Sequence, residues 1–453
     1  DSSRAFRTSP PASLRRGPET PPAIREAEVW PAETTAGRDG HLRVSGVDLV
    51  RLAERWGTPL YVYDAATIRA AYRAYQQAFR PYRPVRVSYA MKACALIGIA
   101  AVIAETGADA SAASIGEVLA ARRAGFPAER IQLHGNAKTD DELRQALRAG
   151  VGRIVIDGAD EIAALARLVR RRSEPQRVWL RVSPGIASDT HEHMRTGALD
   201  SKFGAPLATG DALAQARAIV ATPGLRLVGV HAHLGTELHE ADRYRELAEV
   251  LVAFARELRP LGARVNEIGL GGGLKIPMRG EDHVLSLKEY ADAVGPAVRA
   301  AGDLRAAIYL EPGRSLVGRS GVALYRVVGT KRVPGVRTFV SVDGGMGDNI
   351  RPALYGATYT ALIADRATAP AEEEVAVAGS YCESGDMLIR SVALPTPRRG
   401  EVLAVPGSGA YAVAMASNYN HHVRPAVALI DGGRARLIRK RETHADIWRL
   451  ERR

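Results

Sequence analysis

Cysteine is almost absent: the 453 residues include only Cys94 and Cys382, which lie far apart in the chain. Two distant cysteines are too few for a disulfide framework and are typical of a reducing compartment, so we expect a cytoplasmic protein. Long apolar stretches are missing as well, since no run of about 18 uninterrupted apolar residues occurs. The sequence therefore predicts no membrane-spanning helix.

Lysine is scarce too, with seven residues against 55 arginines. The formal net charge of +12 would suit a nucleic-acid-binding protein, but the basic residues are scattered among 50 acidic ones. A nucleic-acid surface gathers its basic residues into stripes with interleaved aromatic residues. Short basic runs such as 170–172 and 439–441 fit solvated faces instead. We expect no nucleic-acid partner.

The first 40 residues combine frequent prolines and mixed charges with little apolar periodicity. A segment of this composition buries too little apolar surface to offset the entropy of ordering its chain. We predict that residues 1–40 form a disordered tail.

Beyond this tail, apolar β-branched runs alternate with alanine-rich amphipathic segments, which is the pattern of βα units around a parallel sheet. The expected strands are 85–91, 108–113, 131–136, 153–157, 178–183, 227–233, 267–272 and 307–312. The expected helices between them include 115–124, 140–149, 159–170, 242–258 and 287–301. This series predicts a TIM (β/α)8 barrel over residues 64–316. An open doubly wound sheet stays an alternative, because a strand count does not establish closure.

After residue 317 the pattern changes to short segments that alternate apolar and polar residues between glycine and proline turns. Such alternation is typical of antiparallel sheets with one solvated face. We expect a second, mostly antiparallel β domain over 317–453, shaped as a sandwich or a small barrel. The segment 41–63 precedes the first barrel, and its short strands are predicted to join this second domain.

One lysine lies in the apolar run that ends the first expected strand. Lys92 is part of VSYAMKACAL (87–96), whose other members are mostly apolar. Because burying an unpaired ammonium is costly, this lysine must reach an edge, lose its charge or be used chemically. Apolar walls would lower the pKa of its amine and favour a nucleophilic role.

Other reactive residue types also follow the ends of expected strands, where TIM barrels carry their function. They are Lys92, Asp109, His134, Asn136, Arg181, His231, His233, Gly271, Gly272, Gly273, Glu311 and Arg314. A glycine run is usually a turn, yet at a barrel rim its backbone N–H groups can hold a phosphate. Arg314 would add positive charge to such a site.

Histidines raise the question of a metal. His231 and His233 are two residues apart on an expected strand, so their side chains point to one face, as zinc ligands could. The pairs at 191/193 and 421/422 invite the same interpretation. No further cysteine or carboxylate completes a ligand set at metal-site spacing, so we predict no metal. The alternatives are a histidine within the core and a flat ring that faces a planar cofactor.

A nucleophilic lysine, a phosphate site, a flat ring and a carboxylate in one barrel mouth together fit pyridoxal 5'-phosphate. This cofactor has an aldehyde that a lysine can attack and a ring nitrogen that needs an acidic partner. Glu311 suits that role, because an ionised carboxylate there keeps the ring nitrogen protonated. The residues thus predict a pyridoxal phosphate enzyme, and a barrel that binds some other phosphate stays an alternative.

The motifs YAMKA, HAHLGT, GLGGGL, EPGR, CESGD and GAY resemble, in order and spacing, the fold-type III pyridoxal phosphate decarboxylases, which combine an alanine-racemase-like barrel with a β domain. Among these enzymes, the segments 196–204, 346–356, 381–388 and 415–420 resemble the diaminopimelate decarboxylase family. The likeness extends over residues 41–450. It implies the decarboxylation of meso-2,6-diaminopimelate to L-lysine, the last step of lysine biosynthesis.

The resemblance also implies a role for each matched residue. Lys92 would bond to the cofactor, His233 would stack on its ring, and Glu311 would pair with its ring nitrogen. Cys382 would act as a general acid. The implied cofactor contacts are Lys92, Asp109, His233, Thr236, Gly271, Gly272, Gly273, Glu311, Arg314 and Tyr411. The implied substrate contacts are Arg314, Arg351, Tyr355, Glu383 and Tyr411, with Glu383 at the distal amine.

A homodimer with shared active sites is implied as well, because the CESGD segment reaches the neighbouring subunit in this family. A racemase is disfavoured, because no second acid–base residue is marked for the opposite ring face. A non-catalytic carrier of the cofactor is disfavoured by the β domain, which bears Cys382, Glu383 and Tyr411.

Three residues depart from the pattern of the family. Cys94 stands where Asn is usual, Thr236 replaces Ser and Glu237 replaces Gln. Thr236 keeps a hydroxyl for the phosphate, whereas Glu237 adds a negative charge near it unless the side chain points away. These departures leave a paralogous decarboxylase of another amino acid, or of a carrier-bound amino acid in secondary metabolism, as the alternative function.

Overall fold

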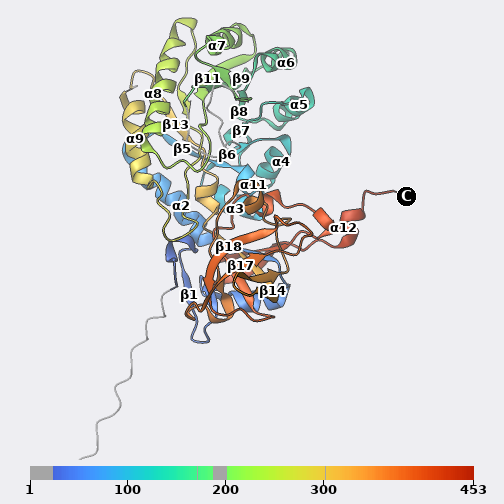
Figure 1. Ribbon diagram of the computed structural model, residues 1–453. Coiled ribbons are helices and arrows are strands. Elements are labelled where there is room, and N and C mark those ends of the chain that lie inside the picture. The colour runs from blue at the N-terminus through green and yellow to red at the C-terminus, as the bar shows by residue number, and fades with distance from the viewer. Residues whose placement is uncertain (1–23, 171, 187–200, 301, 453) are drawn as a thin grey trace, which may run out of the picture.

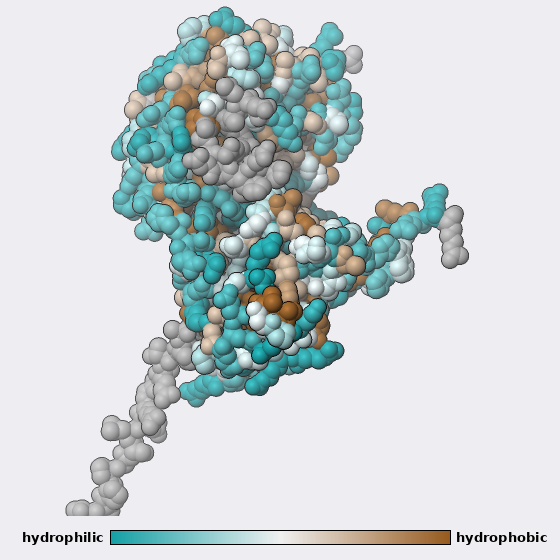
Figure 2. Space-filling model, viewed as in Figure 1, coloured by the Kyte–Doolittle hydropathy of each residue, from teal (hydrophilic) through white to brown (hydrophobic). Residues whose placement is uncertain are grey.

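The computed structural model describes residues 24–452 except 171, 187–200 and 301. Figure 1 shows two lobes, one with helices around a sheet and one built mainly from strands. On the face presented in Figure 2, hydrophilic residues are interspersed with apolar ones over both lobes. Within the described ranges, no helix is both long enough and apolar enough to span a bilayer.

The first lobe is a closed barrel of eight parallel strands. In order around the ring they are β5 (Val85–Ala90), β6 (Asp109–Ala112), β7 (Ile131–Leu133), β8 (Arg153–Ile156), β9 (Gln176–Ser183), β11 (Leu225–His231), β12 (Glu267–Gly269) and β13 (Ala307–Leu310). Pairing of β8 with β9 and of β13 with β5 closes the ring. The predicted TIM barrel is therefore confirmed, and the open sheet is excluded.

Helices surround this barrel, as Figure 1 shows. They are α2 (Ala65–Ala78), α3 (Ile97–Ala104), α4 (Ile115–Arg123), α5 (Asp140–Ala149), α6 (Ala159–Val169), α7 (Asp211–Ala221), α8 (Ala241–Glu257) and α9 (Leu287–Ala300). The sequence encodes their limits locally: Thr139 and Glu142 form a capping box at the start of α5, and Gly150 ends it with a left-handed φ of 71°. Because helices cover its outer face, the barrel has strands that are buried on both sides.

The second lobe contains a mixed, mostly antiparallel sheet in the order β18-β17-β15-β14-β4-β20-β21, with β19 and β16 attached. Its strands are β4 (Leu60–Asp64), β14 (Gly321–Val333), β15 (Arg337–Val342), β16 (Leu362–Ile363), β17 (Glu373–Ala378), β18 (Met387–Leu394), β19 (Val402–Val405), β20 (Ala426–Asp431) and β21 (Arg434–Arg439). Strand β4 precedes the barrel in the chain and pairs with β14 and β20. The segment before the barrel thus contributes a central strand to this sheet.

Short elements complete the described chain. The short strands are β1 (Thr34–Ala36), β2 (Leu42–Val44), β3 (Val47–Asp48) and β10 (Ala205–Pro206). The short helices are α1 (Leu49–Trp56), α10 (Arg314–Val317), α11 (Arg351–Tyr355) and α12 (His444–Trp448). The 3-10 turns are η1 (Ala27–Val29), η2 (Arg80–Tyr82), η3 (Met91–Ala93), η4 (Ala128–Arg130), η6 (Arg259–Leu261), η7 (Ala364–Arg366), η8 (Val413–Met415) and η9 (Tyr419–His421).

The N-terminal segment corrects one prediction. Residues 1–23 lie outside the described residues, but residues 24–40, which we expected to be disordered, are ordered. Val29 and Trp30 are fully buried in the core of the second lobe, and the Arg319 side chain donates hydrogen bonds to the carbonyls of Ala27 and Trp30. A few apolar residues among the prolines are enough to order this segment, because they pack on the surface of the β domain.

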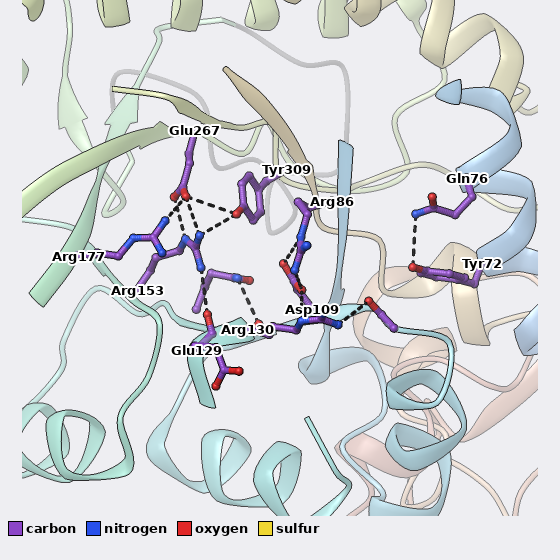
Figure 3. Close-up of polar contacts among 12 residues, drawn as sticks. Tyr72, Gln76, Arg86, Asp109, Glu129, Arg130, Arg153, Arg177, Glu267 and Tyr309 are labelled. Carbon is purple, nitrogen blue, oxygen red and sulfur yellow. Dashed lines mark hydrogen bonds and ion pairs between the residues drawn. The ribbon is translucent and has the colours of Figure 1, made fainter. Parts of the chain in front are cut away.

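The amino ends of the barrel strands carry a buried polar network, shown in Figure 3. Arg153 donates to both carboxylate oxygens of Glu267, at 2.7 and 2.6 Å. The indole Nε1 of Trp179 donates to the same carboxylate at 2.6 Å, and Arg177 also pairs with it. Burial works to raise the pKa of Glu267, but the hydrogen bonds and charge of Arg153 outweigh it, so the pKa lies below its usual value. The network fills the lower end of the barrel with paired charges.

Replacing Glu267 by glutamine would leave Arg153 buried without its counter-charge. We expect E267Q to lower the free energy of unfolding by about 3–5 kcal/mol at neutral pH, measured by urea unfolding. Because the folded pKa of Glu267 lies below 4.5, its stabilisation is present above that pH and is lost as the pH falls further, so the deficit should shrink in acid. The matched control, E249Q on the exposed face of α8, should change stability by less than ~0.5 kcal/mol. Equal effects of the two substitutions would contradict this account.

Candidate active site

A cavity of about 550 Å³ opens at the carboxyl ends of the barrel strands, beside the β domain. Nine of the residues predicted for the site line it: Lys92, His233, Thr236, Gly272, Gly273, Glu311, Arg314, Tyr355 and Tyr411. They come from the ends of four barrel strands and from two segments of the second lobe. The fold thus brings together residues that lie more than 300 positions apart in the sequence.

Lys92 lies in the 3-10 turn η3, directly after β5. Its neighbours Met91, Ala93 and Cys94 are buried, whereas the Lys92 side chain is exposed and lines the cavity. The apolar run therefore anchors the turn in the core while the amine points out of it. Of the alternatives stated for this lysine, one that reaches an edge describes its position, and its amine is accessible for chemical use in the cavity.

Cys94, the departure next to this lysine, does not line the cavity. It is buried, its thiol donates to the Tyr63 hydroxyl at 3.5 Å, and burial raises the pKa of the thiol. The Tyr63 hydroxyl in turn donates to the Gly409 carbonyl at 2.9 Å. Cys94 therefore packs between the barrel and the β domain and stays a protonated thiol.

Glu311 lies at the floor of the cavity, after β13, and is held by two histidines. Its carboxylate oxygens are 2.8 Å from His134 Nε2 and 2.9 Å from His231 Nε2. Burial would raise the pKa of Glu311, but the two imidazoles outweigh it and hold the pKa well below its usual value. Burial lowers the pKa of His134 to about 4, so this ring is neutral at neutral pH. The floor is an ionised carboxylate in contact with two imidazoles, one of which, His231, is hydrogen-bonded to it.

These three residues could also be considered as metal ligands, since their ligand atoms lie within 4.8 Å of one another. Ligand atoms on one tetrahedral zinc lie about 3.3 Å apart, given bond lengths of 2.0–2.1 Å. The contacts of Glu311 are shorter, at 2.8 Å from His134 and 2.9 Å from His231, and the second is a hydrogen bond. The geometry favours hydrogen bonds over a bound ion. The histidine pair at 191/193 lies outside the described residues.

Three glycines follow β12, and two of them, Gly272 and Gly273, line the cavity, whereas Gly271 does not. A Cβ on Gly272 would lie 2.2 Å from the Glu311 carbonyl oxygen, and one on Gly273 would lie 2.2 Å from the Gly235 carbonyl oxygen. Gly271 and Gly273 also have left-handed φ values of 63° and 108°. Only glycine allows this close packing of backbone on backbone. The run leaves main-chain atoms, without side chains, facing the cavity.

His233 lies beside these glycines. Its Nδ1 accepts a hydrogen bond from the Gly272 N–H at 3.3 Å, and burial, together with the charge of Lys92, lowers its pKa well below the usual value. A neutral ring with Nδ1 as acceptor carries its proton on Nε2. The hydrogen bond fixes the orientation of a flat ring at the cavity wall.

Two neighbouring arginines belong to the site, Arg314 from α10 and Arg351 from α11. Arg314 lines the cavity, and its guanidinium lies 5.1 Å from the centre of the Tyr411 ring. Arg351 is buried and donates to the Tyr359 hydroxyl at 2.8 Å. Glu237 pairs with both, at 3.0 Å from Arg351 Nη2 and 3.5 Å from Arg314 Nη2. A carboxylate from the chain itself thus lies between two guanidinium groups.

Tyr411 is held in an uncommon backbone conformation, with a φ of 59°. Its N–H donates to the Ala93 carbonyl at 2.8 Å, one residue from Lys92. A left-handed tyrosine costs of order 1–3 kcal/mol, so the surrounding contacts must hold it in place. This hydrogen bond ties the GAY segment of the β domain to the lysine turn of the barrel.

Asp109, which we predicted to lie near the phosphate, does not line the cavity. It is the first residue of β6, and its carboxylate pairs with Arg86 at 2.6 and 3.0 Å in the network at the amino ends of the strands (Figure 3). Ser111, two residues on, does line the cavity. Residues i and i+2 of a strand share a face but differ in height by about 6.6 Å, so Asp109 belongs to a lower layer of the barrel.

Cys382 and Glu383 are exposed and lie apart from this cavity within the single chain. The Cys382 N–H donates to the Asn420 side chain at 3.2 Å, and the Glu383 carboxylate accepts a hydrogen bond from the Tyr419 hydroxyl. The segment presents its reactive groups on the surface of the β domain.

Several residues in or beside the cavity had no predicted role, and of these Arg181 and His134 line it. Arg181 contacts Asp157 at 3.7 Å and stacks over the Phe203 ring at 4.3 Å. His134 and Arg181 were marked by their strand-end positions, and Glu237 by its departure from the family pattern. Tyr359, which orients Arg351, had no signal in the sequence.

The donor set fits pyridoxal phosphate. An amine at Lys92, a main-chain wall at the glycines with the Thr236 hydroxyl, a flat neutral ring at His233 and an ionised carboxylate at Glu311 match its aldehyde, phosphate, ring face and ring nitrogen. The buried Nε of Arg314 has no hydrogen-bond partner among the described residues. This N–H group could therefore donate a hydrogen bond to a bound anion.

Comparisons with known proteins agree with this chemistry. A family model described as "Pyridoxal-dependent decarboxylase, pyridoxal binding domain" matches residues 65–318. A diaminopimelate decarboxylase of Bacillus subtilis (strain 168) is 42% identical over 418 residues, which are 91% of this chain and 95% of that protein.

Solved structures give the same result. The crystal structure of diaminopimelate decarboxylase from M. jannaschii in co-complex with L-lysine superposes with a TM-score of 0.87 at 31% identity, over 93% of this chain and 98% of that one. Diaminopimelate decarboxylase from Helicobacter pylori complexed with L-lysine superposes with a TM-score of 0.83 at 30% identity, over 89% and 99% of the two chains.

Proposed function

Because the chain belongs to the diaminopimelate decarboxylase family of pyridoxal-dependent decarboxylases, we propose that it converts meso-2,6-diaminopimelate to L-lysine and CO2 in lysine biosynthesis. One observation carries the proposal: a single cavity holds an accessible lysine, an ionised buried carboxylate and an arginine that can bind a distant carboxylate. The first two are the groups that pyridoxal phosphate needs, and the third is a group that a dicarboxylic amino acid needs.

The residues that would hold the cofactor follow from their positions. Lys92 would bond to the aldehyde, and the backbone of 271–273, the Thr236 hydroxyl and Tyr411 would hold the phosphate. His233 would cover the ring face, and the Glu311 carboxylate would accept a hydrogen bond from the protonated ring nitrogen. When bound, pyridoxal phosphate supplies an electron sink for the pair of electrons left on Cα as CO2 departs.

Arg314, Arg351 and Tyr355 would bind the distal carboxylate of the substrate. This contact fixes which end of the molecule lies beside Lys92, where the cofactor aldehyde would be. Plain lysine, offered with its single carboxylate at the reacting end, lacks the distal carboxylate and makes no charged contact with the two arginines. Recognition at the far end would thus select the substrate.

Once CO2 has left, Cα needs a proton. Lys92 reaches the cavity directly, whereas Cys382 and Glu383 are exposed on the β domain. In a two-fold dimer with shared sites, this exposed segment would enter the cavity of the neighbouring subunit, where Cys382 is the second candidate acid and Glu383 would hold the distal amine. Two free cysteines fit a cytoplasmic enzyme.

A second candidate function is the decarboxylation of another amino acid by a paralogous enzyme. The Glu237 carboxylate favours it, because this residue already pairs with both arginines that would bind a distal carboxylate. A substrate without that carboxylate would not need to compete with Glu237.

Offering single substrates to the holoenzyme separates the two functions. We expect CO2 release from meso-diaminopimelate, and far less from lysine, ornithine or arginine, measured with radiolabelled carboxyl groups. Lys92→Ala should lower the rate at least about a hundredfold, because it removes the group that bonds to the cofactor. No release from diaminopimelate alongside turnover of another amino acid would overturn the leading proposal in favour of the second.

Mixing two inactive variants tests the shared site. In a dimer of Lys92→Ala with Glu383→Gln, one of the two sites combines an intact Lys92 with an intact Glu383 from the other subunit. After equal mixing and subunit exchange, roughly a quarter of the wild-type activity should return, because half of the dimers are mixed and each has one intact site. The control mixture of Lys92→Ala with the double variant contains no intact site. Activity that stays absent in the first mixture would show that each site is built from one chain.

A further inference from the structure

Glu237 covers one of the two arginines expected to bind substrate. Arg351 is only 1% exposed and does not line the cavity, because Tyr359 and Glu237 occupy its two Nη atoms. Arg314, its neighbour, lines the cavity and shares the Glu237 Oε1 atom at 3.5 Å. A ligand carboxylate that is to reach both guanidinium groups must therefore take the place of the Glu237 carboxylate.

The charges around this pair do not balance. Arg314 and Arg351 bring two positive charges into a buried region, and the carboxylate that pairs with both is that of Glu237. Burial and the charge of Arg351 lower the pKa of Arg314, and Glu237 opposes that effect. The Nε atoms of both arginines are buried and have no hydrogen-bond partner among the described residues. The pair has the capacity for a further anion.

The backbone holds Glu237 at this place. Its φ of 61° is left-handed, a conformation that is uncommon for glutamate. The next residue, Leu238, is tied to the glycine wall: its N–H donates to the Gly273 carbonyl at 2.9 Å, and its carbonyl accepts from the Lys275 N–H at 3.3 Å. The loop that forms part of the cavity wall therefore also fixes the backbone of Glu237, while its side chain is 31% exposed and has room to turn away.

We infer that the Glu237 carboxylate stands in for the distal carboxylate of the ligand and is a specificity-determining residue of this enzyme. The inference rests on the proposed function. Glu237 competes within the molecule for the arginine pair, so every ligand with a distal carboxylate must displace it. The product lysine keeps that carboxylate after its other end has lost CO2, so the return of Glu237 to the arginines also helps to expel the product.

The effect of Glu237 depends on the charge of its side chain and on the carboxylate of the ligand. A glutamine at 237 has no charge with which to compete, so a distal carboxylate would bind the arginines more tightly. Cadaverine is lysine without its carboxylate and makes no demand on the arginine pair. Comparing lysine with cadaverine therefore isolates the contribution of the carboxylate.

The test measures Glu237→Gln beside Glu240→Gln, a matched change three residues on. Glu240 has a side chain that is 42% exposed and pairs with Arg243 rather than with the arginine pair. In E237Q the KM for diaminopimelate and the inhibition constant of lysine should each fall about tenfold, with the inhibition constant of cadaverine unchanged. In E240Q all three should stay at the wild-type values. Titration calorimetry of the holoenzyme with lysine and with cadaverine gives the same comparison without turnover.

Unchanged or raised values for both diaminopimelate and lysine in E237Q would overturn the inference, as would an equal gain for cadaverine. If E237Q folds poorly, Glu237→Asn also removes the charge and suits the left-handed backbone better. A wild-type enzyme that releases no CO2 from diaminopimelate would instead contradict the proposed function, and calorimetry would still decide whether Glu237 competes with the lysine carboxylate.

Discussion

The floor of the cavity depends on one buried carboxylate. Glu311 is ionised between His134 and His231, which lie at the ends of two other strands of the barrel. An isolated carboxylate at this depth would be expelled or protonated, because the desolvation of an unpaired charge costs several kcal/mol or more. Closure of the ring brings the ends of β7, β11 and β13 to one place, and so makes the ionised state possible. The site is thus a consequence of barrel closure rather than of any one motif.

Around this floor the barrel is divided into layers. The lower layer pairs Glu267 with Arg153 and Asp109 with Arg86, and the upper layer faces the cavity (Figure 3). Both layers use charged residues on the inner face, and beside the cavity the Nε of Arg314 has no hydrogen-bond partner among the described residues. Stability and function therefore occupy opposite ends of the same strands.

The barrel could be predicted from the sequence because its signal is local and repeated: every expected strand is present, from 85–91 to 307–312. The position of a side chain along the barrel axis could not be predicted in the same way. Asp109 and Ser111 share a face in any strand, and only the register with neighbouring strands shows that the first is too low for the cavity. Cys94 and Glu237 were visible as departures, but the contacts of Cys94 with Tyr63 and of Glu237 with Arg351 join residues that no sequence spacing relates. The order of residues 24–40 was not predicted because their few apolar residues are buried in a core formed by residues 42–62 together with strands of the C-terminal lobe.

The central claim is that Glu311, kept ionised by the two histidines, holds the ring nitrogen of the cofactor protonated. Nitrogen-15 NMR of the holoenzyme, loaded with pyridoxal phosphate labelled at the ring nitrogen, tests this directly. The account predicts the resonance of a protonated ring nitrogen in the wild-type enzyme at neutral pH and its loss in Glu311→Gln. A wild-type resonance of an unprotonated nitrogen, or identical spectra for the two proteins, would contradict it.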